Sequence, residues 1–224
     1  MKSDLTSERH ILSREIKAQC NAVFFTILLG FTTVLPLPVA ADVDILIAPE
    51  TLRLIPRKQV VLVDTRSSFK YLLGHVPGAV HLGNWEDFTH RVDGVRGLLN
   101  EDKGFIAKRL KPFGITHNKT IVVYGEPDDP WRADGRFLWM FERYGFNRVA
   151  ILEGGLVGWQ KTGGAIERGR SNKPSPSSLA AGDIHLNDLV AANQKWIAKR
   201  LGSNNLTIID NRTRKEYDGA VPYG

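Results

Sequence analysis

The chain has 224 residues, of which 42% are hydrophobic and 24% are charged, and 30 basic against 24 acidic side chains give a formal net charge of +6. This composition can build one large or two small folded domains, and it excludes a disordered, collagen-like or low-complexity chain. Cys20 is the single cysteine. The chain by itself therefore cannot form an internal disulfide, a thiolate zinc site or an iron–sulfur cluster.

The first 41 residues have the pattern of a secretory signal peptide. Charged residues are scattered over positions 2–17, an uncharged apolar run follows at 22–34, and small residues precede a cleavage point after Ala41. The apolar run is shorter than the roughly 20 residues of a membrane-spanning helix. We therefore predict a signal peptide at residues 1–41, a periplasmic or secreted mature protein, and no membrane attachment after cleavage. An uncleaved anchor, extended through the two prolines that follow the run, is the alternative.

From residue 45 onwards, short apolar runs alternate with amphipathic stretches. Strands are predicted at 60–63, 79–82, 120–124 and 149–152. Helices are predicted at 49–54, 103–110 and 137–144. Apolar strands joined by helical crossovers are typical of an α/β fold with a central parallel sheet flanked by helices.

The composition changes after residue 167. Residues 168–183 read RGRSNKPSPSSLAAGD, a polar stretch with two prolines, which predicts a linker over 168–182. Beyond it, the pattern predicts a helix over 186–201 and a buried strand over 206–209.

An internal repeat connects the two ends of this region. Residues 60–71 read VVLVDTRSSFKY and residues 206–217 read LTIIDNRTRKEY. The two strings align without a gap and pair three residues with their counterparts: Asp64 with Asp210, Arg66 with Arg212, and Tyr71 with Tyr217. The repeat predicts one complete domain at 45–167 and the beginning of a second copy at 183–224. The second piece is close to the length below which a chain rarely folds unaided.

Three ordered motifs resemble the rhodanese family of sulfurtransferases. They are Asp64-Thr65-Arg66, the turn GHVPGA at 74–79, and LEGG at 152–155 followed by Trp159. With the repeat, the chain resembles the tandem thiosulfate or 3-mercaptopyruvate sulfurtransferases, with the second domain incomplete. The resemblance implies a rhodanese-like domain plus the start of a second copy. It also implies transfer of sulfane sulfur from a small anionic donor through a cysteine persulfide, the acceptor being a small thiophile or a protein.

The motif residues also have local structural interpretations. Asp64, at the end of a buried strand, is expected to pair with Arg66. The residues of the two glycine-bearing motifs are expected to shape turns and pack the core: His75, Pro77, Gly78, Gly154, Gly155 and Trp159. An acid–base role for His75 is the weaker alternative, because the sequence indicates no serine, cysteine or carboxylate partner for it.

The position expected to carry the chemistry lacks a cysteine. In rhodaneses the reactive cysteine directly follows the strand equivalent to 120–124, where backbone N–H groups and a helix N-terminus stabilise its thiolate. Gly125 stands at this position, and the loop after it contains prolines, which lack N–H donors. We predict a degenerate, non-catalytic loop in which two arginines offset three carboxylates: Gly125, Glu126, Asp128, Asp129, Arg132 and Arg136. The loop also lacks the pattern of a calcium site.

Two hypotheses follow. In the first, the chain is the front part of an exported tandem sulfurtransferase whose catalytic cysteine lies beyond Gly224, with Arg212 near the substrate cleft of the second domain. In the second, the chain is a non-catalytic rhodanese-like module that binds a partner protein or an anion. The net charge is +6, but no run of basic residues lies beside aromatic residues on which bases could stack, as a nucleic-acid groove would require. Accordingly, no nucleic-acid partner, metal or cofactor is predicted.

Overall fold

The computed structural model describes residues 44–129, 132–171 and 174–221. They belong to one unit, residues 42–224. The predicted signal peptide, with Cys20, lies outside the described residues. Within the described ranges, no helix is long and apolar enough to cross a membrane.

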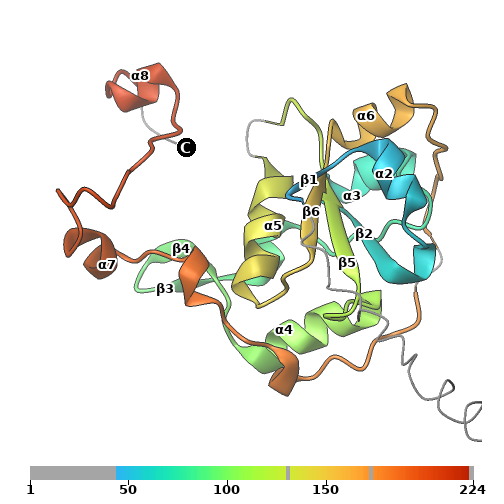
Figure 1. The fold of residues 1–224 in the computed structure, drawn as a ribbon, viewed down its shortest axis with the longest axis horizontal. Helices are drawn as coiled ribbons and strands as arrows, with labels where there is room; N and C mark the ends of the chain where they lie inside the picture. The colour runs from blue at the N-terminus through green and yellow to red at the C-terminus, as the bar shows by residue number, and fades with distance from the viewer. Residues whose placement is uncertain (1–43, 130–131, 172–173, 222–224) are drawn as a thin grey trace, which may run out of the picture. The chain divides into compact units, whose positions relative to one another are not determined.

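Four parallel strands form the central sheet, in the order β1-β6-β5-β2 (Figure 1). They are β1 (Leu46–Ile47), β2 (Val60–Asp64), β5 (Thr120–Tyr124) and β6 (Val149–Leu152). Every residue of β2 and β5 is buried, as expected for parallel strands covered on both faces. Their register places Asp64 opposite Tyr124. The carboxyl ends of these two strands therefore meet at one edge of the sheet.

Helices cover both faces of this sheet (Figure 1). They are α2 (Pro49–Leu54), α3 (Ser68–Leu73), α4 (Lys103–Leu110), α5 (Ala133–Arg143) and α6 (Gly155–Lys161). Val61 and Val63 of β2 pack with α4 and α5 in one apolar cluster. Val60 and Leu62 pack with α2 and α6 in the other. This alternation follows from the two-residue period of a strand, and it confirms the predicted α/β class with a parallel sheet flanked by helices.

Several element predictions need correction. The strand predicted at 79–82 forms a single parallel bridge, between Val63 and Val80, because the bonds to β2 run through the backbone of Val80, to Leu62 and Asp64. The helix predicted at 137–144 begins earlier, at Ala133. The prediction also omitted β1, α3, α6 and an antiparallel hairpin formed by β3 (Thr89–Val92) and β4 (Val95–Leu99). The exposed hairpin has too few buried residues to give a clear strand pattern.

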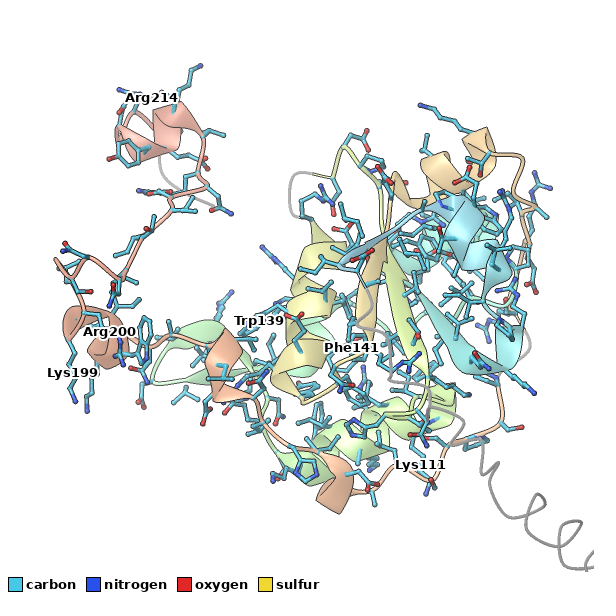
Figure 2. All side chains as sticks on the ribbon, in the orientation of Figure 1. Lys111, Trp139, Phe141, Lys199, Arg200 and Arg214 are labelled. Carbon is cyan, nitrogen blue, oxygen red and sulfur yellow. The ribbon has the colours of Figure 1, made fainter. Side chains whose placement is uncertain are left out.

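The segment predicted as a linker packs against the domain. Leu179 is 4% exposed and lies in the same apolar cluster as α4 and α5. The Ser177 N–H donates to the Lys111 carbonyl oxygen (2.9 Å). Further along, Trp139 of α5 donates its Nε1–H to the Val190 carbonyl oxygen at 2.7 Å, and Figure 2 shows Trp139 on α5. Although the segment is mostly polar, a few of its residues, such as Leu179, attach it to the domain.

The predictions for the last forty residues are wrong in detail. The helix expected over 186–201 is reduced to α7 (Gln194–Ala198). The strand expected over 206–209 does not form, and Ile209 is 83% exposed. A buried strand needs neighbouring strands for its backbone groups and apolar surface for its side chains. Among the described residues no strand lies beside this segment, which ends in the short helix α8 (Arg214–Tyr217).

Candidate functional site

A cleft of about 340 Å³ lies where β2 and β5 end. It is lined by residues that follow these two strands: Thr65, Arg66, Ser67, Lys70, Gly125, Glu126, Asp128 and Asp129. In open α/β sheets, ligands bind beyond the carboxyl ends of the strands. The structure thus brings the Asp-x-Arg motif and the predicted degenerate loop together at the place expected for a binding site. Pro130 and Trp131 of that loop lie outside the described residues.

Arg66, which lines the cleft, pairs with the buried Asp64 at the end of β2. Arg66 donates from Nε to Asp64 Oδ1 at 3.0 Å and from Nη2 to Oδ2 at 2.6 Å. The same Nη2 reaches the Gly74 carbonyl oxygen at 2.6 Å. Burial and the nearby Asp64 carboxylate raise the pKa of the Tyr124 hydroxyl well above its ordinary value. Nε and Nη2 of Arg66 are bonded to Asp64 and Gly74, so the geometry shows the expected structural pair and leaves Nη1 for the longer contact to Glu126.

The carboxylate of Glu126 is neutralised from the α3 side. Lys70 Nζ donates to Glu126 Oε2, and Arg66 Nη1 lies 3.9 Å from Glu126 Oε1. The hydrogen bond to Glu126 raises the pKa of Lys70. The sequence-based expectation that two loop arginines alone offset the acidic loop is therefore wrong. Lys70 lies 56 positions earlier in the chain, and only the strand pairing brings it to the loop.

The N-terminus of α5 is occupied by the chain's own carboxylates. Asp129 Oδ2 accepts from the Ala133 N–H at 3.3 Å, and Asp134 Oδ1 accepts from the Gly135 N–H at 2.8 Å. Arg132, in the left-handed region with φ of 44°, clamps the Asp134 carboxylate with two hydrogen bonds of 3.0 Å. A helix N-terminus attracts anions. Here the anions are internal, so a small anionic ligand meets negative charge at this end of the helix.

Gly125 is buried between the two strand ends and leaves little room for a side chain. A Cβ at this position would lie 3.2 Å from Thr65 Oγ1 and 3.6 Å from Asp134 Cγ. Thr65 Oγ1 is itself fixed, because it donates to the Tyr124 carbonyl oxygen at 3.0 Å. Arg136 lies on the first turns of α5, where its N–H donates to the Arg132 carbonyl oxygen at 3.2 Å. A side chain at the position equivalent to the rhodanese cysteine would therefore require Thr65 to shift by a few tenths of an ångström.

The two glycines after β6 allow close packing of α6. Gly155 has a φ of +56°, and a Cβ there would lie 2.2 Å from the Gly125 carbonyl oxygen. Gly154 is also in the left-handed region, with φ of 68°. Trp159 is buried on the same helix and donates its Nε1–H to the Ala165 carbonyl oxygen at 2.8 Å. Trp159 lies in the apolar cluster of α2 and α6, and the two glycines shape the turn before α6.

His75 is fully buried in the turn that follows α3. Its Nδ1 lies 2.8 Å from the Tyr71 carbonyl oxygen and its Nε2 lies 2.6 Å from Ser171 Oγ. The Gly78 N–H, where φ is 73°, donates to Glu167 Oε2 at 2.8 Å. The Pro77 carbonyl oxygen accepts from Arg57 at 2.6 Å. Sequence reasoning found no serine or carboxylate for His75, because Ser171 lies 96 positions away in a segment expected to be a linker.

Arg212, predicted to lie near the substrate cleft of the second domain, is outside the lining of this first-domain cleft, which does not test that prediction. It forms an exposed fork with Asp210, from Nε at 2.9 Å and from Nη2 at 2.6 Å, and this bond lowers the pKa of Asp210 to about 2. Within the described ranges, no group of three His, Cys, Asp or Glu side chains could hold a metal ion.

Residues 48–162 match the family of rhodanese-like domains. The chain belongs to the rhodanese family. Among its rhodanese relatives, a thiosulfate sulfurtransferase of Corynebacterium glutamicum is 30% identical over 169 residues, which cover 73% of this chain and 52% of that protein. A thiosulfate sulfurtransferase of Pseudomonas aeruginosa is 29% identical over 184 residues, covering 81% and 64%. A 3-mercaptopyruvate sulfurtransferase of Escherichia coli is 27% identical over 162 residues, covering 70% and 53%. The chain thus spans between half and two-thirds of these relatives.

Solved structures agree on the rhodanese fold. The crystal structure of the 3-mercaptopyruvate sulfotransferase SseA from Escherichia coli has a TM-score of 0.66 to this chain at 22% identity, covering 79% of this chain and 69% of that one. A structure of EanB in complex with ergothioneine has a TM-score of 0.62 at 22% identity, covering 79% and 46%.

Proposed function

We propose that this chain supplies the non-catalytic first domain of an exported tandem rhodanese-type sulfurtransferase. The enzyme transfers sulfane sulfur from thiosulfate or mercaptopyruvate to a thiophilic acceptor, either a small molecule or a protein. The persulfide-carrying cysteine belongs to a second domain, of which residues 183–224 are the beginning. The names of the relatives support the reaction class. Their greater length supports the second domain.

The observation that carries this proposal is a repeat of local geometry. The Arg212 N–H donates to Asp210 Oδ1 at 3.0 Å, the distance found between the Arg66 N–H and Asp64 Oδ1. Both arginines bring Nη2 to within 2.6 Å of the second carboxylate oxygen. After each fork, a hydroxyl side chain caps a short helix. Ser67 and Thr213 occupy these equivalent cap positions.

The second copy lacks the surroundings that the first copy has. Asp64, the last residue of β2, is 1% exposed, whereas Ile208 and Ile209, which precede Asp210, are 60% and 83% exposed. Apolar β-branched residues favour a buried strand. Completion of a second sheet by further chain would bury them. The segment is therefore interpreted as the opening strand and helix of that sheet.

We assign the first domain a supporting role because the carboxylates of its loop would repel an anionic sulfur donor. Asp129 and Asp134 occupy the N-terminus of α5, and Gly125 supplies no thiol. A thiolate needs a positive environment to lower its pKa. The cleft wall from Thr65 to Lys70 is the candidate surface against the second domain.

The test begins with the gene. We expect the reading frame to continue past the codon for Gly224 into a second Gly-His-x-Pro-Gly-Ala motif and a cysteine after a buried strand. The extended protein should form thiocyanate from thiosulfate and cyanide, or pyruvate from mercaptopyruvate, whereas the 224-residue chain should form neither. A stop codon directly after Gly224, together with a stable, monodisperse protein, would overturn the proposal. It would favour the alternative of a non-catalytic module that binds a partner protein or an anion.

Export is tested separately, by intact mass. Expression of the whole chain in a bacterial host should yield an exported species that begins at Asp42. The exported fraction should lack Cys20 and give no thiol signal from that residue. An exported species that retains Met1 would contradict cleavage and favour the anchor.

A further inference from the structure

Ser171 and His75 form a contact that the proposed sulfur transfer does not use. Ser171 Oγ lies 2.6 Å from His75 Nε2, a short hydrogen bond between a hydroxyl and an imidazole. His75 is fully buried, stacked on the Tyr71 ring with centroids 4.0 Å apart. The imidazole is therefore held in one orientation behind the hydroxyl.

The second ring nitrogen fixes the direction of the Ser171–His75 bond. His75 Nδ1 lies 2.8 Å from the Tyr71 carbonyl oxygen. A carbonyl oxygen can only accept, so Nδ1 carries the proton and Nε2 of the neutral ring accepts from the Ser171 hydroxyl. Glu167 Oε2 lies 3.7 Å from Nε2. Glu167 also takes part in a hydrogen bond with Ser171, so its carboxylate is a second acceptor beside the hydroxyl.

The hydroxyl faces a cavity of about 260 Å³. Most of its lining is apolar, contributed by Tyr71, Leu72, Val80, Phe113 and Pro174. Arg170, the residue before Ser171, also lines the cavity and is the cationic group there that could stabilise a developing oxyanion. A nucleophile, a base, a group that orients the base and an apolar pocket are the parts of a covalent hydrolytic site.

We propose that Ser171, activated by His75, is an acyl-accepting nucleophile for carboxylic esters with a short apolar acyl group. This inference does not rest on the proposed sulfur transfer. The small, largely apolar cavity suits an acyl chain of a few carbons. The degenerate cleft at Gly125 takes no part in it.

The proposed reaction has two stages, acylation of Ser171 and hydrolysis of the acyl-serine. Ser171 Oγ forms a bond to the ester carbonyl carbon while its proton passes to His75 Nε2. The bond from the carbonyl carbon to the leaving oxygen then breaks, and the proton on Nε2 goes to the departing alcohol. Water, deprotonated by Nε2, attacks the acyl-serine and releases the carboxylic acid, and the proton returns to Ser171 Oγ.

The first test uses a fluorophosphonate probe and p-nitrophenyl butyrate on the whole chain. Peptide mapping should place the probe on Ser171, and Ser171→Ala should abolish labelling and lower ester hydrolysis by about 100-fold. Ser178→Ala is the matched control, because Ser178 is an exposed serine on the same segment. Labelling that is absent or spread over several serines would overturn the proposal, as would equal hydrolysis by the protein and Ser171→Ala.

A second variant separates activation from simple exposure of a serine. His75→Gln should abolish labelling while leaving Ser171 in place. If circular dichroism shows that His75→Gln does not fold, His75→Asn replaces it, and labelling of the folded variant decides. Undiminished labelling of Ser171 in a folded His75 variant would contradict the assigned base.

Discussion

The Arg66 guanidinium holds both carboxylate oxygens of Asp64, with Nε 3.0 Å from Oδ1 and Nη2 2.6 Å from Oδ2. The pair is nearly enclosed, since the two side chains are 8% and 0% exposed. Through the Gly74 carbonyl oxygen it also ties the end of β2 to the turn after α3. The pair therefore organises the edge of the sheet at which the cleft lies.

Removing one partner of this buried pair should lower the free energy of unfolding. Asp64→Asn leaves the Arg66 charge without its carboxylate, and loss of one member of a buried pair costs about 3 kcal/mol. Urea unfolding of the whole chain should show this loss in the free energy of unfolding. Asp210→Asn is the matched control, because it breaks the same fork on an exposed segment, and it should leave the unfolding midpoint unchanged. Equal effects of the two substitutions would contradict the assignment of Asp64 to the core.

A cysteine placed at Gly125 should remain a poor nucleophile. In a Cys20→Ser background, we expect the thiol of Gly125→Cys to have a pKa above about 8.5, because the Asp134 carboxylate is close and the cavity is tight. The pH dependence of iodoacetamide alkylation measures this value. Adding Asp134→Asn should lower it by about one unit. Thiosulfate-dependent cyanolysis by Gly125→Cys alone would show that the loop is competent.

The close approach of α6 to the cleft should not tolerate a side chain. Gly155→Ala places a Cβ 2.2 Å from the Gly125 carbonyl oxygen, so the two backbones must separate. Gly78→Ala is the control: it has a positive φ of 73° with nothing within 4 Å of the new Cβ, and it should cost about 1 kcal/mol. In thermal unfolding, the melting temperature of Gly155→Ala should be well below that of Gly78→Ala. Equal melting temperatures would mean that backbone strain alone matters at Gly155.

Glu167 should make the domain sensitive to acid. The Gly78 N–H bond, with smaller contributions from Ser171 and His75, lowers the pKa of Glu167 below its ordinary value. A carboxyl group with a lowered pKa in the folded state stabilises the fold above its unfolded pKa and loses this effect as the pH falls. Glu167→Gln should therefore reduce stability at pH 7, and the difference from the unaltered protein should shrink below about pH 5. Urea unfolding at several pH values measures it, with exposed Glu153→Gln as the control.

Much of the fold could be predicted from local patterns in the sequence. The strands at β2, β5 and β6 could be predicted because each is a run of β-branched residues closed by polar or glycine residues, and only burial on both faces suits such runs. The Asp-x-Arg fork could also be predicted, because its hydrogen bonds join residues two positions apart. For this reason the fork forms alike in the buried copy at Asp64 and the exposed copy at Asp210.

The rest depends on contacts between distant parts of the chain. Lys70 neutralises Glu126 and Ser171 reaches His75 only because the sheet and the returning segment bring them together. Conversely, the apolar run at 206–209 has the pattern of a strand but remains exposed, since a strand exists only where neighbours satisfy its backbone and cover its side chains. Sequence by itself therefore determined the family, the buried strands and the local forks. The tertiary structure determined that Lys70 neutralises Glu126, that Ser171 contacts His75, and that the strand predicted at 206–209 does not form.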